Sequence, residues 1–250
     1  ISPWDTCHMA DELDEFDDFD DDLDLTLYAD SSELLAEVFT QLNEIIEIGL
    51  RINGIFHLAL TGGTLGTDLT SALVKNWNSH PGAFSGLHIW WSDERFVESG
   101  SPERNCAPVI QSLTNSEIHV HAVKSSDEVA TIEDAVTAYS HELDETFMDL
   151  TILGLGPDGH VASLFPDAAQ IDNLEKVIAI KDSPKPPALR ASFTLSMINE
   201  STLVWIIAAG ASKADAVTKI IEGDLSIPAS YIRAVDHTRL IVDTDALFTE

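Results

Sequence analysis

Basic residues are scarce in this chain of 250 residues, which has 13 lysines and arginines against 43 aspartates and glutamates and a formal charge of −30. A field of that sign repels phosphate groups, so we expect no binding to nucleic acid or to an anionic membrane surface. An anionic ligand must therefore bind where some of the few basic side chains gather. None of these side chains occurs before Arg51.

Cysteine is also rare, and long apolar runs are missing. Cys7 and Cys106 cannot build a disulfide framework and lack metal-ligand spacing, which favours a reducing compartment. Cys106 has no activating partner in the sequence, so we expect it to serve in packing. No apolar run approaches the roughly 20 residues that span a bilayer, and the first 25 residues are acidic, unlike a secretory signal. We expect a cytoplasmic monomer without a membrane segment.

The N-terminal region is dominated by acid. Residues 10–24 carry ten carboxylates and no base, and repulsion between like charges favours an extended, solvated chain. An acidic tail that folds back onto the protein's own basic site is the alternative. We assign residues 1–22 to a flexible tail and residues 23–250 to a single α/β domain, for which the 44% hydrophobic content supplies a core.

From residue 23 the apolar pattern alternates between the strand and the helix period. Residues 23–28 alternate as a strand does, and a helical stripe follows, with Asp30 or Ser31 as N-cap and Gly54 at its end. Further strands are predicted at 55–60, 87–91, 118–123, 150–156, 176–180, 202–209 and 239–243, with helices notably at 128–147 and 211–222. Such strands, apolar on both faces and separated by helices, predict a mostly parallel sheet covered on both sides. Ligands of such sheets bind beyond the carboxyl ends of the strands.

A glycine-rich segment, TGGTLGTDL, follows the strand at 55–60. Gly62, Gly63 and Thr64 could close around an anion at the start of a helix that we expect near Thr67. The segment is neither a Walker loop nor a dinucleotide fingerprint, because the lysine and the spacing are absent. A plain turn between strand and helix remains the alternative.

Three cations follow other predicted strands. Arg95, in the triplet Asp93-Glu94-Arg95, offers a fork suited to phosphate or carboxylate, although an internal ion pair would also explain it. Arg190 stands with Lys185 in a segment that three prolines stiffen, which suggests a loop that places Arg190. Lys213 lies in the first turn of a predicted helix, where a bound anion would offset its unfavourable interaction with the helix dipole.

The stretch DLTILGLGPDGHVASLFPD, residues 149–167, turns from a buried strand into a polar turn. Pro157 and Gly159 fix that turn, with His160 at its apex and a helix possible from Ser163. A solvent-exposed turn histidine is the default interpretation. Asp158, however, is close enough in the chain to orient an imidazole or to bind a substrate hydroxyl, so we predict a chemical role for His160.

Other candidate sites are weaker. His119 and His121 alternate on one predicted strand and share a face, which would permit a metal, but the sequence places no third ligand, so we favour a structural role. A G-x-S-x-G elbow for a serine hydrolase is absent from the sequence.

Five segments together resemble the 6-phosphogluconolactonase family in order and separation: TGGT at 61–64, WWSDERFV at 90–97 with Asn105, the stretch at 149–166, SPKPPALR at 183–190 and GASKADAV at 210–217. The resemblance covers roughly residues 23–245. It implies a Rossmann-like three-layer α/β/α fold of the NagB/RpiA-like kind, shared with glucosamine-6-phosphate deaminases. It also implies hydrolysis of 6-phospho-D-glucono-1,5-lactone to 6-phosphogluconate in the pentose phosphate pathway, without metal or organic cofactor.

Carried over position by position, the resemblance makes His160 the general base, assisted by Asp158. It also implies that the substrate, and chiefly its phosphate, is bound by Gly62, Gly63, Thr64, Asp93, Arg95, Gly159, Arg190 and Lys213. The chain departs from the family pattern at Leu65 and Gly66, where the loop S-G-G-S-T-P often has threonine and proline, at Glu98 in place of proline, and at Cys106 in place of an aromatic residue.

Two rival functions remain open. A glucosamine-6-phosphate deaminase shares the fold and a similar histidine turn, but that family usually continues with Asn-Glu-Pro, where this chain has Ser163-Leu164-Phe165-Pro166. A non-catalytic sugar-phosphate sensor would normally carry a DNA-binding helix pair, whereas the extra segment here is an acidic tail that DNA repels.

Overall fold

The computed structural model describes residues 23–166 and 173–248, so the predicted acidic tail at 1–22 lies outside the described residues. The strands are β1 (Leu23–Tyr28), β2 (Phe56–Leu60), β3 (Leu87–Trp91), β4 (Asp93–Arg95), β5 (His119–Val120), β6 (Leu150–Gly154), β7 (Val177–Ile180), β8 (Arg190–Phe193), β9 (Leu203–Ala208) and β10 (His237–Asp243). The helices are α1 (Ser31–Asn53), α2 (Gly63–Ser79), α3 (Ala107–Ser112), α4 (Ile132–Leu143), α5 (Leu195–Asn199), α6 (Ala214–Ile221) and α7 (Thr244–Leu247), with the 3-10 turns η1 (Ala211–Lys213) and η2 (Pro228–Tyr231).

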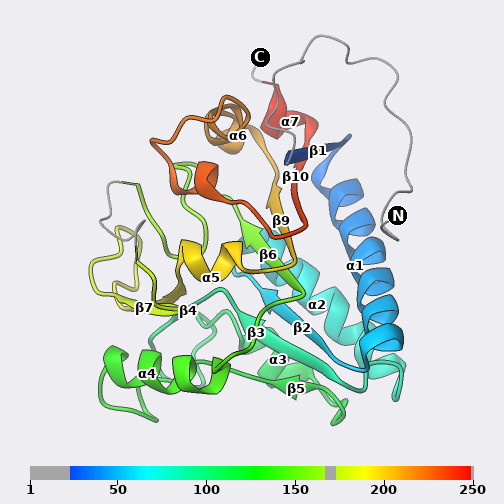
Figure 1. Ribbon diagram of the computed structural model, residues 1–250, viewed down its shortest axis with the longest axis vertical. Coiled ribbons are helices and arrows are strands. Elements are labelled where there is room, and N and C mark those ends of the chain that lie inside the picture. Colours follow the sequence, from blue (N-terminus) through cyan, green and yellow to red (C-terminus); the bar gives the residue numbers. More distant parts are fainter. Residues whose placement is uncertain (1–22, 167–172, 249–250) are drawn as a thin grey trace.

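Seven strands form one sheet in the order β1-β10-β9-β6-β2-β3-β5, and each neighbouring pair runs parallel. Figure 1 shows β1, at the start of the described chain, next to β10, near its end. All the carboxyl ends therefore lie along one edge. The predicted α/β class with a mostly parallel sheet is confirmed.

The sheet separates two apolar clusters because successive side chains of a strand point to opposite faces. In β9, Leu203, Trp205 and Ile207 pack with α1 and α2, while the residues between them pack with α4 and α6. Burying each large side chain of this kind contributes about 1.5–3 kcal/mol. Helices therefore cover both faces, which gives the three layers.

A second, antiparallel sheet of order β4-β8-β7 was not predicted. Its strands β4 and β8 are short and carry charged or polar residues without a clear alternation, so pairing with each other, and not local propensity, makes them strands. The register places Asp93 opposite Ser192, and Arg95 opposite Arg190. This small sheet therefore brings two predicted site cations side by side.

The helix predictions were partly right. Asp30 caps α1 by accepting hydrogen bonds from the N–H groups of Ser32 and Glu33, and Gly54 ends the helix with a φ of 75°. The strand predicted at 118–123 is only His119–Val120, the helix predicted at 128–147 is only Ile132–Leu143, and no helix begins at Ser163.

Of the helices described, none combines the length and apolarity that crossing a bilayer requires.

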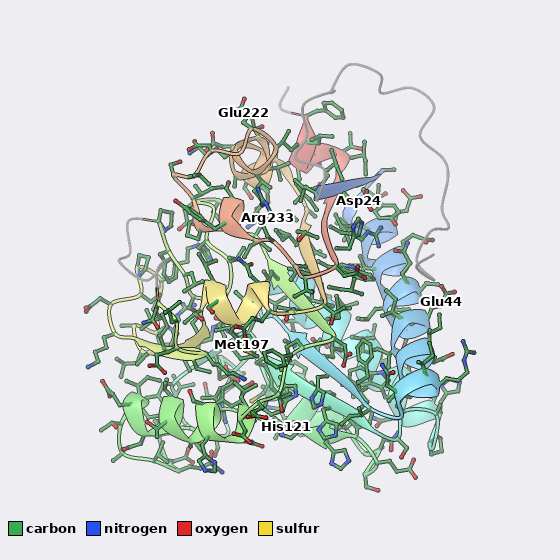
Figure 2. The ribbon with its side chains drawn as sticks, viewed as in Figure 1. Asp24, Glu44, His121, Met197, Glu222 and Arg233 are labelled. Atoms are coloured by element: carbon green, nitrogen blue, oxygen red, sulfur yellow. The ribbon has the colours of Figure 1, made fainter. Side chains whose placement is uncertain are left out.

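Four histidine rings cluster on the α4 side of the sheet: His57 on β2, His88 on β3, and His119 and His121 on and just after the edge strand β5. The ring centroid of His88 lies 4.7 Å from that of His57, 4.4 Å from that of His119 and 5.1 Å from that of His121. The Nδ1 atom of His121 lies 2.6 Å from an Oε1 atom of Glu142, at the end of α4 (Figure 2). Within residues 23–166 and 173–248, no three His, Cys, Asp or Glu side chains are grouped to hold a metal ion. The stacked rings favour the structural interpretation of His119 and His121.

This cluster makes the fold sensitive to acid. Burial, followed by the neighbouring imidazoles, lowers the pKa of His88 from 6.5 to about 4. Between these values the unfolded chain binds more protons at this position than the folded chain does. The stability that the neutral His88 side chain contributes is therefore fully present above about pH 6.5 and is lost as the pH falls towards 4.

We predict that His88→Gln reduces the loss of stability between pH 7 and pH 5. The expected gain is about 1 kcal/mol after discounting for solvent exposure, which corresponds to a fall in Tm that is about 2–4 °C smaller than in the wild type. Calorimetry of both proteins at several pH values measures this. His141→Gln, which alters an exposed histidine of α4, should follow the wild-type curve, and identical acid sensitivity in His88→Gln would contradict the prediction.

Candidate active site

The predicted polar segments meet beyond the carboxyl ends of β2, β3, β6 and β9. The hydroxyl of Thr61, after β2, accepts a hydrogen bond of 3.2 Å from the N–H of Gly154 at the end of β6. A Cβ atom on Gly62 would lie only 2.0 Å from the Oδ1 atom of Asn105, which follows β4 in the chain. Three loops that are distant in sequence are thus in contact.

The glycine-rich segment begins α2 at Gly63, four residues before the predicted start at Thr67. Gly63 has a φ of 75°, a conformation that residues with a Cβ rarely adopt. No side chain caps this helix, so the first-turn N–H groups face the edge of the sheet without a side-chain acceptor. Such a helix start is a suitable site for an anion.

The histidine turn is closed by its own backbone. The N–H of Gly156 donates to the carbonyl of His160 at 2.8 Å, and the N–H of Gly159 donates to the carbonyl of Gly156 at 3.0 Å. Gly159 has a φ of 80°, and its Cβ would collide with Ile227, so backbone conformation and packing both require a glycine, and its predicted contact with substrate stays a prediction. A Cβ on Gly156 would lie 1.9 Å from the His160 Nδ1 atom. The imidazole fits because position 156 lacks a side chain.

His160 and Asp158 form a hydrogen bond between the imidazole Nδ1 and the carboxylate Oδ1 atoms. Because a carboxylate only accepts, the proton must lie on Nδ1, which leaves the lone pair of Nε2 free to act as a base. Lys185 completes the group, with its Nζ atom 3.2 Å from His160 Nδ1 and 3.5 Å from Asp158 Oδ1. The aromatic ring of Phe165 lies 4.8 Å from the imidazole, measured between centroids.

The surroundings keep this imidazole neutral. Burial lowers the pKa of His160, the Asp158 carboxylate raises it, and the ammonium of Lys185 lowers it again, for a net decrease. Burial raises the pKa of Asp158, but the hydrogen bond from His160 and the charge of Lys185 bring it below the ordinary value. Burial and the charge of Lys185 lower the pKa of Lys213, while Asp158 opposes them. Lys213 therefore lies within electrostatic range of this group.

Asp93 is a buried connection between the loops. Its carboxylate accepts hydrogen bonds from the Ser163 hydroxyl at 2.7 Å and from the Asn105 amide at 3.0 Å. The Nη1 atom of Arg190 lies 3.9 Å away. Asp93 thus joins β4, the segment after the histidine turn and β8, and its predicted contact with substrate stays a prediction.

The guanidinium of Arg190 binds backbone carbonyls of the proline-rich loop. Its guanidinium donates to the carbonyls of Lys185, Pro186 and Pro187 at 2.9, 3.3 and 3.1 Å, and to the Ser163 hydroxyl at 3.4 Å. The side chain is buried. The loop therefore places Lys185 beside His160, with Arg190 as its support, which is the reverse of the sequence interpretation. The signal for Lys185 was present, because it lies in the same stiffened segment.

Arg95 faces a separate hollow of about 460 Å³ between α2 and α3. Thr67, Lys75, Arg104 and Asn105 are among its lining residues, and no carboxylate is. The Nη1 atom of Arg95 donates to the Glu103 carbonyl at 2.6 Å. Among the contacts of the described residues, none joins Arg95 to His160 or to Lys213.

Cys106 lies next to this hollow and is buried. Burial, and then the charge of Glu94, raise the pKa of its thiol well above the ordinary value. A thiol in that state is a poor nucleophile, which agrees with the predicted packing role.

Taken together, the parallel sheet, the uncapped helix start and an oriented neutral imidazole among cations define an α/β protein that can bind a small anion beside a general base. Within that class the sequence is specific. The family model of glucosamine-6-phosphate isomerases/6-phosphogluconolactonase matches residues 29–242, and the chain belongs to this family.

Several relatives of the chain are named 6-phosphogluconolactonases. The chain is 37% identical over 212 residues to a 6-phosphogluconolactonase of Streptomyces coelicolor, covering 77% of this chain and 81% of that protein. It is 31% identical over 239 residues to a 6-phosphogluconolactonase of Mycobacterium tuberculosis, covering 89% and 96%. The crystal structure of a 6-phosphogluconolactonase from Thermotoga maritima superposes with a TM-score of 0.78 at 27% identity, covering 89% of this chain and 100% of that one. A monomeric glucosamine-6-phosphate deaminase, with a TM-score of 0.73 at 17% identity, shares the fold.

We predict that Asp93→Asn lowers the free energy of unfolding by about 2–3 kcal/mol, because buried Arg190 loses its charged partner and the new NH2 group faces a donor whichever way the amide turns, Asn105 on one side or Arg190 on the other. Denaturant titration at pH 7 measures this. Asp68→Asn, the same change at an exposed position of α2, should stay within about 0.5 kcal/mol of the wild type. Equal stability of the two variants would show that Asp93 does not connect the loops.

Proposed function

We propose that this chain is a 6-phosphogluconolactonase, which hydrolyses 6-phospho-D-glucono-1,5-lactone to 6-phosphogluconate in the pentose phosphate pathway. The observation that carries the proposal is the His160 imidazole, which Asp158 orients with Nε2 unprotonated and which its surroundings hold neutral. The names of the relatives support the same activity.

The chemistry needs a base, a water molecule and a substrate held in place. In the proposed reaction, Nε2 of His160 takes a proton from water while the water oxygen attacks the C1 carbonyl of the lactone. The tetrahedral intermediate then breaks the bond between C1 and the ring oxygen, and the imidazolium returns its proton to that oxygen. The product is an open-chain acid. No covalent intermediate with the enzyme is required, because a δ-lactone is already an activated ester.

The phosphate of the substrate does not react, so its binding energy can hold C1 against His160. The first turn of α2 at Gly62, Gly63 and Thr64 supplies open N–H groups, and Lys213 supplies a charge next to the histidine turn. Arg95 would approach from the side of the hollow. In this proposal these groups bind the phosphate, and Gly159 serves mainly to shape the turn.

We further propose that the protein works as a cytoplasmic monomer with no nucleic-acid or membrane partner. The net charge of −30 supports the lack of such partners, because it repels polyanions. Light scattering of the purified chain tests the monomer directly.

We predict that His160→Gln lowers kcat for the lactone about 10²- to 10⁴-fold, because the variant lacks the base. Acid release from freshly prepared 6-phosphogluconolactone, corrected for spontaneous hydrolysis, measures this, with circular dichroism as the check on folding. Full activity of the variant would contradict the role of His160. Ammonia release from glucosamine 6-phosphate by the wild type, without lactone hydrolysis, would replace the proposed function with a deaminase.

We predict that Lys213→Met raises KM about 10- to 100-fold and changes kcat much less, because a charged contact to a non-reacting phosphate is worth about 1.5–3 kcal/mol. The same acid-release assay over a range of substrate concentrations separates the two constants. Lys219→Met, in α6 next to Asp215, is the matched control and should retain the wild-type KM. A fall in kcat alone would show that Lys213 acts on the reacting end of the substrate and not on its phosphate.

A further inference from the structure

We propose that Lys185 is a positioning residue for the general base, because its ammonium lets Asp158 orient His160 without promoting protonation of the imidazole. The inference rests on the proposed function, in which His160 must be neutral to accept a proton.

The geometry places two nitrogen atoms around one carboxylate oxygen. Oδ1 of Asp158 accepts the hydrogen bond from His160 Nδ1 and lies 3.5 Å from Lys185 Nζ. Nζ also lies 3.2 Å from Nδ1. Both of these nitrogen atoms carry protons when Asp158 accepts from Nδ1, so the lysine acts on the imidazole through its charge and not as a hydrogen-bond donor.

A histidine paired with a carboxylate normally becomes a stronger base, because the negative charge stabilises the imidazolium. At cytoplasmic pH, a larger share of such a histidine would be protonated and unable to take a proton from water. The ammonium of Lys185 offsets the carboxylate charge at nearly the same place. Asp158 then fixes the ring and its tautomer while the free lone pair on Nε2 is preserved.

The charged groups that act on His160 come from several elements. Asp158 belongs to the same turn, Asp93 reaches the imidazole electrostatically from β4, and Lys213 interacts with Asp158 and Lys185 from η1. Lys185 is nevertheless the cation in contact with the imidazole.

The structure also builds a support for Lys185. The guanidinium of Arg190 donates to the carbonyl of Lys185 at 2.9 Å, and the Ser183 hydroxyl donates to the same carbonyl at 2.8 Å. The Lys185 side chain itself is 42% exposed, so it can be replaced without opening the core. Its position is therefore set by the backbone of the loop, and its charge can be tested separately.

The test is the pH profile of kcat/KM between pH 5 and 8.5 for Lys185→Met and Lys185→Arg. Without the ammonium, His160 should become protonated at higher pH, so the acid limb of the Lys185→Met profile should move upwards. Activity relative to pH 8 should then fall about three- to tenfold further at pH 5.5 than in the wild type, the size expected for one nearby charge that solvent partly screens. Lys185→Arg keeps the charge and should restore the wild-type profile.

Lys181→Met is the matched control. It removes the same charge from the start of the same loop, but Lys181 pairs with Glu133 of α4 and not with the site. Its profile should match that of the wild type. Lys185→Gln provides a second uncharged variant if Lys185→Met does not fold. A loss of activity that is equal at all pH values in the uncharged variants would overturn the inference.

A second measurement separates this inference from the proposed function. The ring of His160 can be titrated by NMR in the wild type and in Lys185→Met without any substrate. A higher titration midpoint in the variant is expected, and an unchanged midpoint overturns the role of Lys185 whatever the activity. If the wild type fails to hydrolyse the lactone, the proposed function falls, while the NMR titration still decides the effect of Lys185.

Discussion

The hydrogen bond between Asp158 and His160 is the interaction on which the proposed chemistry depends, and it exists only because position 156 has no side chain. A methyl group there would occupy the place of the imidazole Nδ1 atom. The turn is further closed by backbone hydrogen bonds from Gly156 and Gly159. The absent Cβ thus leaves room for the imidazole beside Asp158, and that carboxylate fixes the tautomer and so determines which nitrogen can act as a base.

Charge is distributed so that this base works in a strongly acidic protein. Several cations away from the site lie close to a carboxylate, as Lys181 does to Glu133 and Arg239 to Asp24. At the site Lys185 and Arg190 also lie close to a carboxylate, whereas Lys213 has no ion pair among the described contacts. An unpaired, partly buried ammonium is costly, and a bound anion would remove that cost. The scarcity of basic residues in the sequence is therefore what makes each cation at the sheet edge informative.

The sequence predicted the main sheet and the central turn well, for physical reasons. Strands such as β9 are apolar on both faces, a local pattern that only a covered parallel sheet satisfies. His160 and Asp158 are two residues apart, so their proximity was visible in the chain. The small sheet of β4 and β8 was missed, because its strands form by pairing across almost a hundred residues of sequence and carry no period of their own.

The same distinction explains why the sequence analysis took Arg190, and not Lys185, as the cation that the proline-rich loop places at the site. A proline-stiffened loop with one lysine and one arginine does not say which cation it presents, because that depends on where the loop docks. The structure buries Arg190 against Ser163 and near Asp93, and this leaves Lys185 at the imidazole. The guanidinium of Arg190 has five donors, so it can bind several buried carbonyls at once. The ammonium of Lys185 is a compact charge, which is what the titrating ring of His160 needs beside it. The division of labour follows from the shapes of the two side chains, and only the fold reveals which of them stands next to His160.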